Sequence, residues 1–207
     1  MPLGEITVNM RNIICNNCVG ARLYQAENCQ FQNPFMWCSE DSKDFMNLIS
    51  HYDTLNLDDV SFSFERYRNK PNNSVLVTIP FNGGDIRCHF IHYVLDINQK
   101  APVRVNETND IKFCDIIDYA KDKWSRRQKR NTEEPLFLII DNFKTNLDDF
   151  IGLQTRYKIV VFTPDVNKAR RVFKNNAEII KCPWGKEERS TVAIAKYLLA
   201  NKKPIFL

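Results

Sequence analysis

The sequence predicts an α/β fold: a mostly parallel, doubly wound three-layer sheet with a small antiparallel β insert. Two observations support this prediction. In the C-terminal third, short continuous apolar runs alternate with segments of helical periodicity, which is typical of parallel strands buried on both faces. Between residues 57 and 110, short strand-like segments instead follow one another, and the pairs Asn72-Asn73 and Gly83-Gly84 mark turns between them.

The N-terminal segment predicts a strand, a turn and a helix. Residues 6–14 favour a strand, Asn16-Asn17 marks the turn, and residues 19–26 are compatible with a helix. Asn33-Pro34 then breaks the chain. A second helix is expected to follow, capped by Ser39 or Asp41 and with one apolar face formed by Phe45, Leu48 and Ile49.

The middle of the chain predicts the insert. Its strands are expected at residues 60–64, 74–79 and 86–93. Residues 97–110 are polar and poorly patterned, so we expect a loop there that is mobile or covers a site. The chain is therefore divided as one α/β domain, residues 1–207, which contains a β-rich insert and loop at residues 57–110.

The remainder predicts one long helix and then regular alternation. Apolar positions recur at helical spacing from residue 111 to residue 130, and the helix ends in basic residues, which suits its dipole. Strands are then expected at residues 136–140, 159–162 and 179–181, and helices at residues 147–153, 168–173 and 191–199.

Composition indicates an ordinary folded protein. Of 207 residues, 43% are hydrophobic and 26% are charged, which excludes general disorder. No apolar run approaches the roughly 18 residues of a membrane span, and the N-terminus lacks a signal-peptide pattern. The seven cysteines are an odd number spread through predicted elements, unlike the paired cysteines of a secreted scaffold. We therefore expect a cytoplasmic protein with mostly reduced thiols, whose net charge of +4 attracts anions only where basic residues cluster.

Cys18 is the best candidate for a reactive residue. It follows the first predicted strand at the start of a helix, where backbone N–H groups and the helix dipole favour a thiolate. A packed structural thiol is the competing interpretation. Cys15 and Cys18 also form a CxxC pair, which suits a redox pair or half of a metal site, but no second CxxC exists. Because Cys29 and Cys38 add only irregular spacing, we predict no metal site and no cofactor, and expect Cys15 to pack within its strand.

Histidine and aspartate supply candidate partners for this thiol. His89 and His92 are candidate general bases, and in a regular strand they face opposite sides, so only one should meet Cys18. His51 is expected to be exposed. Asp141 ends a buried strand, where an α/β sheet presents polar groups to ligands. It either orients a histidine or caps the next turn.

The long helix carries a candidate anion-binding cluster. Guanidinium groups suit phosphate or carboxylate, although a charge run is also typical of a solvated face. No nucleic-acid motif accompanies it, so we do not expect a nucleic-acid partner. Gly83-Gly84 lacks a nucleotide-binding fingerprint. The cluster consists of Trp124 among Lys121, Lys123, Arg126, Arg127, Lys129 and Arg130.

Four segments carry a family resemblance. They are residues 13–20 (Ile-Ile-Cys-Asn-Asn-Cys-Val-Gly), 33–35 (Asn-Pro-Phe), 89–93 (His-Phe-Ile-His-Tyr) and 124–130 (Trp-Ser-Arg-Arg-Gln-Lys-Arg). In this order they resemble the domain of unknown function 1919 family, which is associated with exopolysaccharide biosynthesis. Through its Asn-Cys, Pro-Phe-Met-Trp and Trp-Ser-Arg-Arg patterns the chain is also similar to a set of papain-like cysteine peptidases. The resemblance favours His92 over His89 and singles out Asn17, Cys18, His92, Trp124, Arg127 and Arg130.

Three functional hypotheses follow. In the first, a bacterial Cys–His acyl or group transferase, or a hydrolase, acts on a cell-surface polysaccharide or its precursor. Cys18 is then the nucleophile, His92 the base and Asp141 the third member, while Asn17, Trp124 and the arginines hold a glycan, sugar phosphate or acyl donor. In the second, the chain is a non-catalytic domain that binds an anionic glycan or protein partner. In the third, Cys15 and Cys18 serve a redox or metal function.

Overall fold

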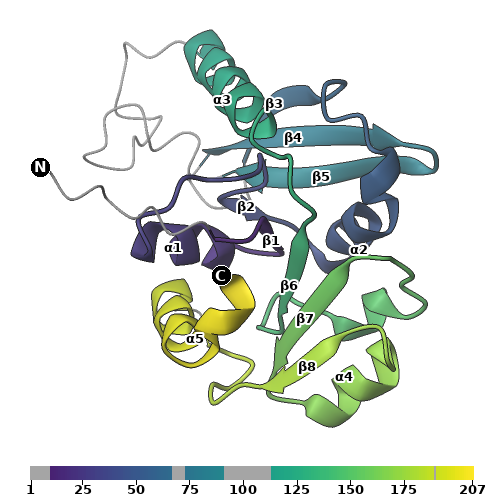
Figure 1. Cartoon of the computed structure of the whole chain (residues 1–207). Coiled ribbons are helices and arrows are strands. Elements are labelled where there is room, and N and C mark those ends of the chain that lie inside the picture. The colour runs from purple at the N-terminus through teal and green to yellow at the C-terminus, as the bar shows by residue number, and fades with distance from the viewer. Residues whose placement is uncertain (1–9, 67–72, 91–112, 189) are drawn as a thin grey trace, which may run out of the picture.

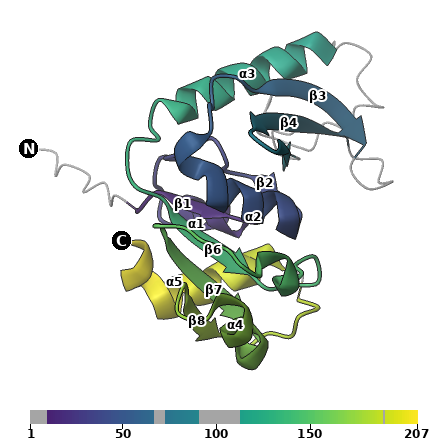
Figure 2. The same cartoon turned by 90° about the vertical axis from the view of Figure 1, so that its right-hand side faces the viewer.

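The architecture is taken from a computed structural model that describes residues 10–66, 73–90, 113–188 and 190–207. The described residues form five α-helices and two four-stranded sheets, one parallel and one antiparallel (Figure 1). The predicted α/β class is therefore confirmed. Figure 2 shows the antiparallel sheet and helix α3 at one end of the molecule, with α4 and α5 at the other.

The parallel sheet has the strand order β1-β6-β7-β8. Its central strands are buried on both faces, which explains why they are continuous apolar runs in the sequence. All four carboxyl ends lie at the same edge of the sheet. The strands are β1 (Ile13–Cys15), β6 (Leu136–Ile140), β7 (Lys158–Thr163) and β8 (Glu178–Lys181).

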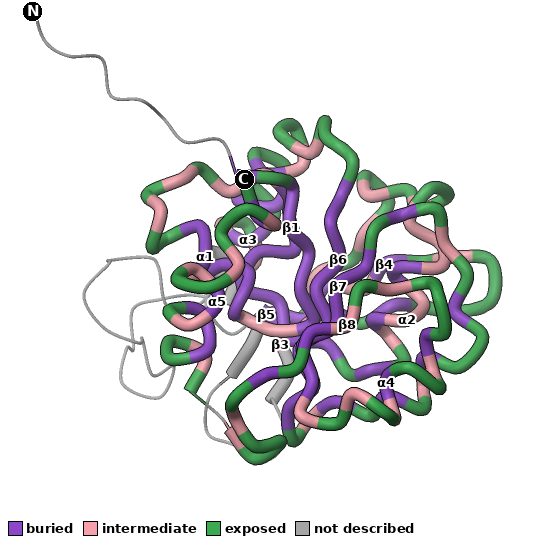
Figure 3. Tube along the Cα trace, turned by 60° about the horizontal axis from the view of Figure 1, so that its bottom comes forward, coloured by how far each residue is buried: buried purple, intermediate pink, exposed green. Residues whose placement is uncertain are grey.

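Alternate residues of these strands belong to two different hydrophobic cores. Ile13 packs with α1 (Val19–Ala26) and α5 (Thr191–Phe206), whereas Ile14 packs with the helices of the opposite face. Figure 3 shows the buried central strands between exposed outer segments. The opposite face is covered by α2 (Ser42–His51), the 3-10 helix η3 (Leu147–Phe150) and α4 (Val166–Phe173).

Helix α1 lies directly against β1. A Cβ atom added at Gly20 would come within 2.9 Å of the Cys15 Cβ, so glycine allows this close approach. As expected, Cys15 is buried in the packing of its strand.

The antiparallel sheet shares a core with the parallel one. Its strand order is β2-β5-β4-β3, and α3 (Phe113–Gln128) packs on β3. Buried residues of both sheets, such as Val77 and Phe137, belong to one hydrophobic cluster. The strands are β2 (Cys38–Ser39), β3 (Ser61–Arg66), β4 (Asn73–Phe81) and β5 (Gly84–Phe90).

The elements follow the sequence prediction with a few differences. Helix α1 and strand β6 have the predicted limits, and Asp41 caps α2 with its side chain. The antiparallel sheet equals the parallel one in strand number because β2, which was not predicted, joins it. Only a single 3-10 turn forms where a helix was expected at residues 147–153. The predicted loop at 97–110 and the first four residues of the predicted strand at 6–14 lie outside the described residues.

Candidate site at the carboxyl edge of the parallel sheet

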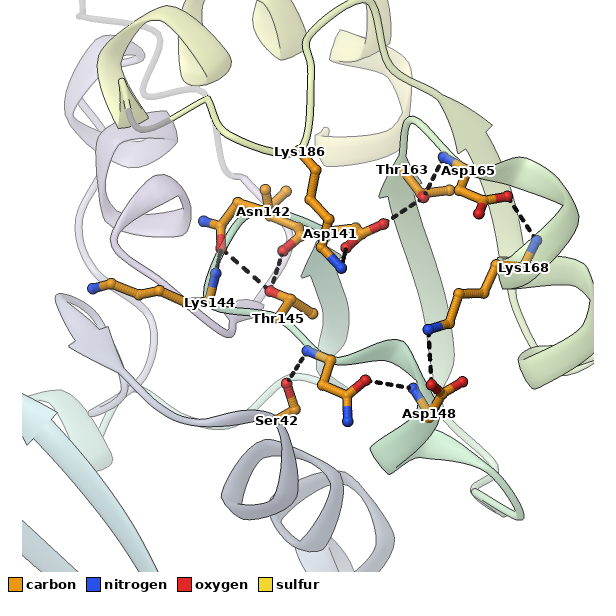
Figure 4. Close-up of polar contacts among 12 residues, drawn as sticks. Ser42, Asp141, Asn142, Lys144, Thr145, Asp148, Thr163, Asp165, Lys168 and Lys186 are labelled. Carbon is orange, nitrogen blue, oxygen red and sulfur yellow. Dashed lines mark hydrogen bonds and ion pairs between the residues drawn. The ribbon is translucent and has the colours of Figure 1, made fainter.

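The carboxyl edge of the parallel sheet collects polar residues from successive strands. Asn16, Asn17 and Cys18 follow β1, Asp141 and Asn142 follow β6, and Thr163 ends β7. Lys186 reaches this edge from the segment after β8, as Figure 4 shows. Ligands of open α/β sheets bind beyond this edge, so it is the first place to look for a site.

Asn16 fixes the first loop to the second. Its side-chain amide donates to the Ile140 carbonyl (3.2 Å) and to the Thr145 hydroxyl (3.1 Å), and its Oδ1 accepts from the Ile140 N–H (3.0 Å). The Thr145 hydroxyl in turn donates to the Ile140 carbonyl (2.7 Å). All these groups are buried, so the two loops that carry Cys18 and Asp141 are held in one arrangement.

Cys18 is the N-cap residue of α1 and is partly exposed. Its Sγ lies 3.8 Å from the Trp37 carbonyl oxygen and 3.9 Å from that of Cys38. Burial raises the pKa of the Cys18 thiol to about 11, although the cations Lys144 and Arg22 act to lower it. Sequence reasoning expected the helix start to favour a thiolate. Desolvation has the opposite and larger effect, so the thiol is neutral near pH 7.

The side chains of Asn17 and Cys15 make different contacts beside Cys18. The Asn17 Oδ1 accepts from the Val19 N–H (2.9 Å) at the start of α1, whereas its Nδ2 is buried with no hydrogen-bond partner in the part of the chain that the structure describes. The Cys15 thiol contacts the Asn16 and Asn17 side chains, and burial raises its pKa to about 12. Cys15 and Cys18 are both free thiols and have different neighbours.

Asp141 is buried and has two polar partners in the described chain. The Thr163 hydroxyl donates to its Oδ2 (2.7 Å), and Lys186 Nζ lies 3.5 Å from its Oδ1 (Figure 4). Among the described residues, the partners of its carboxylate are thus a hydroxyl and an ammonium group rather than an imidazole. The next turn is capped by Asn142, whose Oδ1 accepts from the Lys144 N–H (3.0 Å).

Two of the three histidines are described by the structure, and they lie in different settings. His92 lies outside the described residues, so its predicted role as a base stays a prediction. His89 is on β5, opposite Ser39 of β2, and on the face away from the buried Cys88 and Phe90. His51 ends α2, where its ring lies 4.6 Å from that of Phe81.

The predicted cluster on α3 divides between core and surface. Trp124 is buried and its indole N–H donates to the Leu57 carbonyl (3.0 Å). Arg127 is also buried: its Nη1 donates to the Met36 carbonyl (3.0 Å), and its guanidinium lies over the Phe31 ring at 4.6 Å. Arg126 is on the surface and pairs with Asp122, and Arg130 is exposed. The structure therefore does not bring these four residues to one surface, nor to the carboxyl edge.

Two cations that act to lower the Cys18 pKa were not singled out from the sequence. Arg22 lies one helical turn after Cys18, and Lys144 comes from the loop after β6. Arg22 also lines a pocket of about 230 Å³ between α1 and α5. The spacing of four residues between Cys18 and Arg22 was a signal that both lie on one face of a helix. The other residues around the pocket are Gln25, Ala26, Val192, Ala195 and Lys196.

A second group of reactive side chains lies between β2 and β5. The Cys38 and Cys88 thiols both donate to Oε1 of Glu40, at 2.9 and 3.4 Å. Within the described residues, this is the group in which three possible metal-ligand side chains converge. Sequence reasoning missed it because Cys38 and Cys88 are far apart in the chain.

Comparison with protein families gives one match. The model of a domain of unknown function, DUF1919, matches residues 4–189, which contain both sheets. The chain belongs to the DUF1919 family. A search of curated proteins found no matching relative. In the described parts of this DUF1919 chain, no helix has the length and apolar composition required to cross a bilayer.

Proposed function

We propose that the carboxyl edge of this DUF1919 domain binds an anionic ligand, a sugar phosphate or similar precursor of a cell-surface polysaccharide. One arrangement carries the proposal: Arg22 lies one helical turn after Cys18 on α1, and Lys144 lies in the loop after β6 that Asn16 ties to the loop of Cys18. Two cations on neighbouring segments of a sheet edge favour a negatively charged ligand.

Unpartnered donors support the same proposal. The Asn17 Nδ2 and the Arg22 Nε are buried without a hydrogen-bond partner in the described residues. Buried donors usually have a partner, so these two atoms need an acceptor such as phosphate oxygen. The pocket between α1 and α5 adds Lys196 and Gln25 near Arg22, and its alanine and valine side chains suit the less polar part of a sugar.

The expected result of a binding experiment is selective affinity for the charged sugar. Isothermal titration calorimetry with a hexose 1-phosphate should show binding that the neutral hexose lacks. Arg22→Gln and Lys144→Gln should each weaken binding about 10- to 100-fold, because each removes a charge-assisted contact. Lys129→Gln, at an exposed residue just after α3, is the matched control. Equal binding of both sugars, or unchanged affinity in both variants, would contradict the proposal.

A second candidate is Cys18-dependent group transfer or hydrolysis. It is favoured by the position of a partly exposed thiol at the same edge. In this reaction the Cys18 sulfur attacks an acyl carbonyl, the leaving group departs with a proton, and an acceptor or water then cleaves the thioester. Because the free thiol is neutral, a base such as His92 must remove its proton. Asp141 is already paired with Lys186, so in this reaction its role would be to help fix the positions of the residues at the carboxyl edge.

The alkylation rate of Cys18 separates the two candidates. Because the Cys18 pKa is about 11, few Cys18 thiols are ionised at pH 7, and iodoacetamide should label this residue slowly. Below that pKa, the labelling rate should rise about tenfold per pH unit. Lys144→Gln removes a cation that lowers the pKa, so it should slow labelling at any given pH. Peptide mass spectrometry would measure both, with Cys29 as the reference thiol. Labelling of Cys18 faster than Cys29 at pH 7, abolished by His92→Ala, would instead favour the nucleophile.

The redox state of the cysteines bears on the cellular compartment of the protein. The six described cysteines are all free thiols. Free thiols persist in reducing compartments, so we infer that the protein is cytoplasmic.

A further inference from the structure

We propose that Cys38, Glu40 and Cys88 form a zinc site inside the core between strands β2 and β5. Cys38 lies on β2, Glu40 directly follows that strand, and Cys88 lies on β5, which pairs with β2 through Ser39 and His89. This register brings Glu40 opposite Cys88 and places Cys38 two residues away on the same face. Its three ligand side chains are not those of the proposed ligand site, so it goes beyond that site, although the two are neighbours: the Glu40 N–H donates to the Asn16 carbonyl (3.4 Å).

The distances among the three ligand atoms suit a metal ion. The sulfur atoms of Cys38 and Cys88 and a carboxylate oxygen of Glu40 all lie within 4.8 Å of one another. A tetrahedral zinc ion with Zn–S bonds of about 2.3 Å separates two sulfurs by roughly 3.8 Å and a sulfur from an oxygen by roughly 3.5 Å. The thiol–carboxylate distances here are 2.9 and 3.4 Å, so zinc would require only a small opening of the cluster.

Glu40 supplies the observation that a packed pair of thiols does not explain. It is 5 % exposed, and its Oε2 is buried without a hydrogen-bond partner among the described residues. Its described partners are two thiols, and the charged groups that act on it most strongly, Asp44 and Asp41, are acidic. Buried carboxylates are normally paired with a cation or bound to a metal. One carboxylate oxygen and two sulfurs supply three of the four donor atoms of a tetrahedral zinc ion, which leaves the fourth position for a water molecule.

The ligand types select among metals. Calcium and magnesium take oxygen ligands, and copper(I) prefers sulfur alone, whereas zinc accepts thiolate and carboxylate together. Burial raises the pKa of Glu40 to about 8 and that of Cys88 to about 12, so binding would release protons from the cluster. Each thiol becomes a thiolate as its proton leaves and its Zn–S bond forms, with no change in oxidation state.

Metal binding to the full-length protein tests the site. After chelator treatment under reducing conditions, the wild type should bind one zinc ion per chain in a competition titration with a chromogenic chelator. Cobalt(II) should give the thiolate charge-transfer absorption of a tetrahedral sulfur site. Cys38→Ser and Cys88→Ser should weaken zinc binding more than about 100-fold, since loss of a direct ligand exceeds the 10- to 100-fold cost of losing an outer-shell partner. Glu40→Gln should weaken it as well.

Two controls keep the test independent of folding. Cys182→Ser changes a buried thiol outside the cluster and should retain full zinc affinity. In the wild type alone, zinc should protect Cys38 and Cys88 from alkylation while Cys29 remains reactive. Absence of zinc binding, absence of the cobalt absorption, or unchanged affinity in the Cys38→Ser/Cys88→Ser double variant would overturn the proposal. Copper(I) bound in preference to zinc would overturn the choice of metal.

Discussion

Replacing Trp124 with alanine is expected to destabilise the protein by about 3–5 kcal/mol, the cost typical of removing a large buried aromatic side chain. Trp124 is 2 % exposed, and three rings pack edge-on against it: Phe35 at 5.5 Å, Phe62 at 6.1 Å and Phe90 at 5.9 Å. Its indole also donates to the Leu57 carbonyl. The substitution therefore removes ring contacts and a hydrogen bond in the core that joins α3 to the antiparallel sheet.

Urea denaturation of matched variants would measure this cost. Trp124→Phe keeps part of the ring contact but leaves the Leu57 carbonyl without this donor, so it should cost about 1–3 kcal/mol. Arg126 is two residues after Trp124 but on the exposed face of α3, so Arg126→Ala should change the free energy of unfolding by less than about 0.5 kcal/mol. If Trp124 instead served a ligand, Trp124→Ala would leave the unfolding midpoint near that of wild type while ligand affinity fell.

The sequence pattern around Trp124 suggested a ligand-binding cluster, so this stability measurement tests that prediction. The helix spacing contained the distinction: Ala120, Trp124 and Arg127 are separated by four and three residues and fall on one face. Arg126 lies on another face of the same helix, where it pairs with Asp122. Charge composition alone suggested a shared role, but a buried arginine is held by a carbonyl and a ring as readily as by a ligand.

The parallel sheet was predictable from the sequence because its signals are local. β6 and β7 are apolar runs bounded by polar residues, and α1 starts immediately after the Asn16-Asn17 turn. β2 has only two residues, too few for a pattern, and it exists because it pairs with β5. The Cys38–Glu40–Cys88 cluster depends on that pairing. No local signal in the chain therefore indicates it.

The carboxyl edge was predictable in part. Asp141 was correctly expected to follow a buried strand, at the carboxyl edge of the sheet, and Cys18 was correctly placed at the start of α1. The partners of Asp141 were not predictable, because Lys186 comes from the segment after β8. The protonation state of Cys18 also depends on tertiary structure. The dipole of a helix can be inferred from its start, whereas the desolvation that raises the thiol pKa depends on everything packed around it.

Asn16→Ala is the second substitution with a large expected effect, a loss of about 2–4 kcal/mol in the free energy of unfolding. The alanine leaves the buried Ile140 N–H without its acceptor and the Thr145 hydroxyl without its donor, and an unsatisfied buried group costs about 1–3 kcal/mol. Asn142→Ala, in the adjacent loop, removes the acceptor of the Lys144 N–H and should cost about 1 kcal/mol.

Asn16 also holds the loops that carry Cys18 and Lys144, so its loss should affect the proposed ligand site before the protein unfolds. At a urea concentration where the variant remains folded, the affinity for a hexose 1-phosphate should fall, since the loop of Lys144 would no longer be tied to the segment that leads into α1 and Arg22. An Asn16→Ala variant with wild-type stability would show that strand pairing alone fixes the edge. Normal stability together with normal affinity would remove the structural basis for treating the two loops as one site.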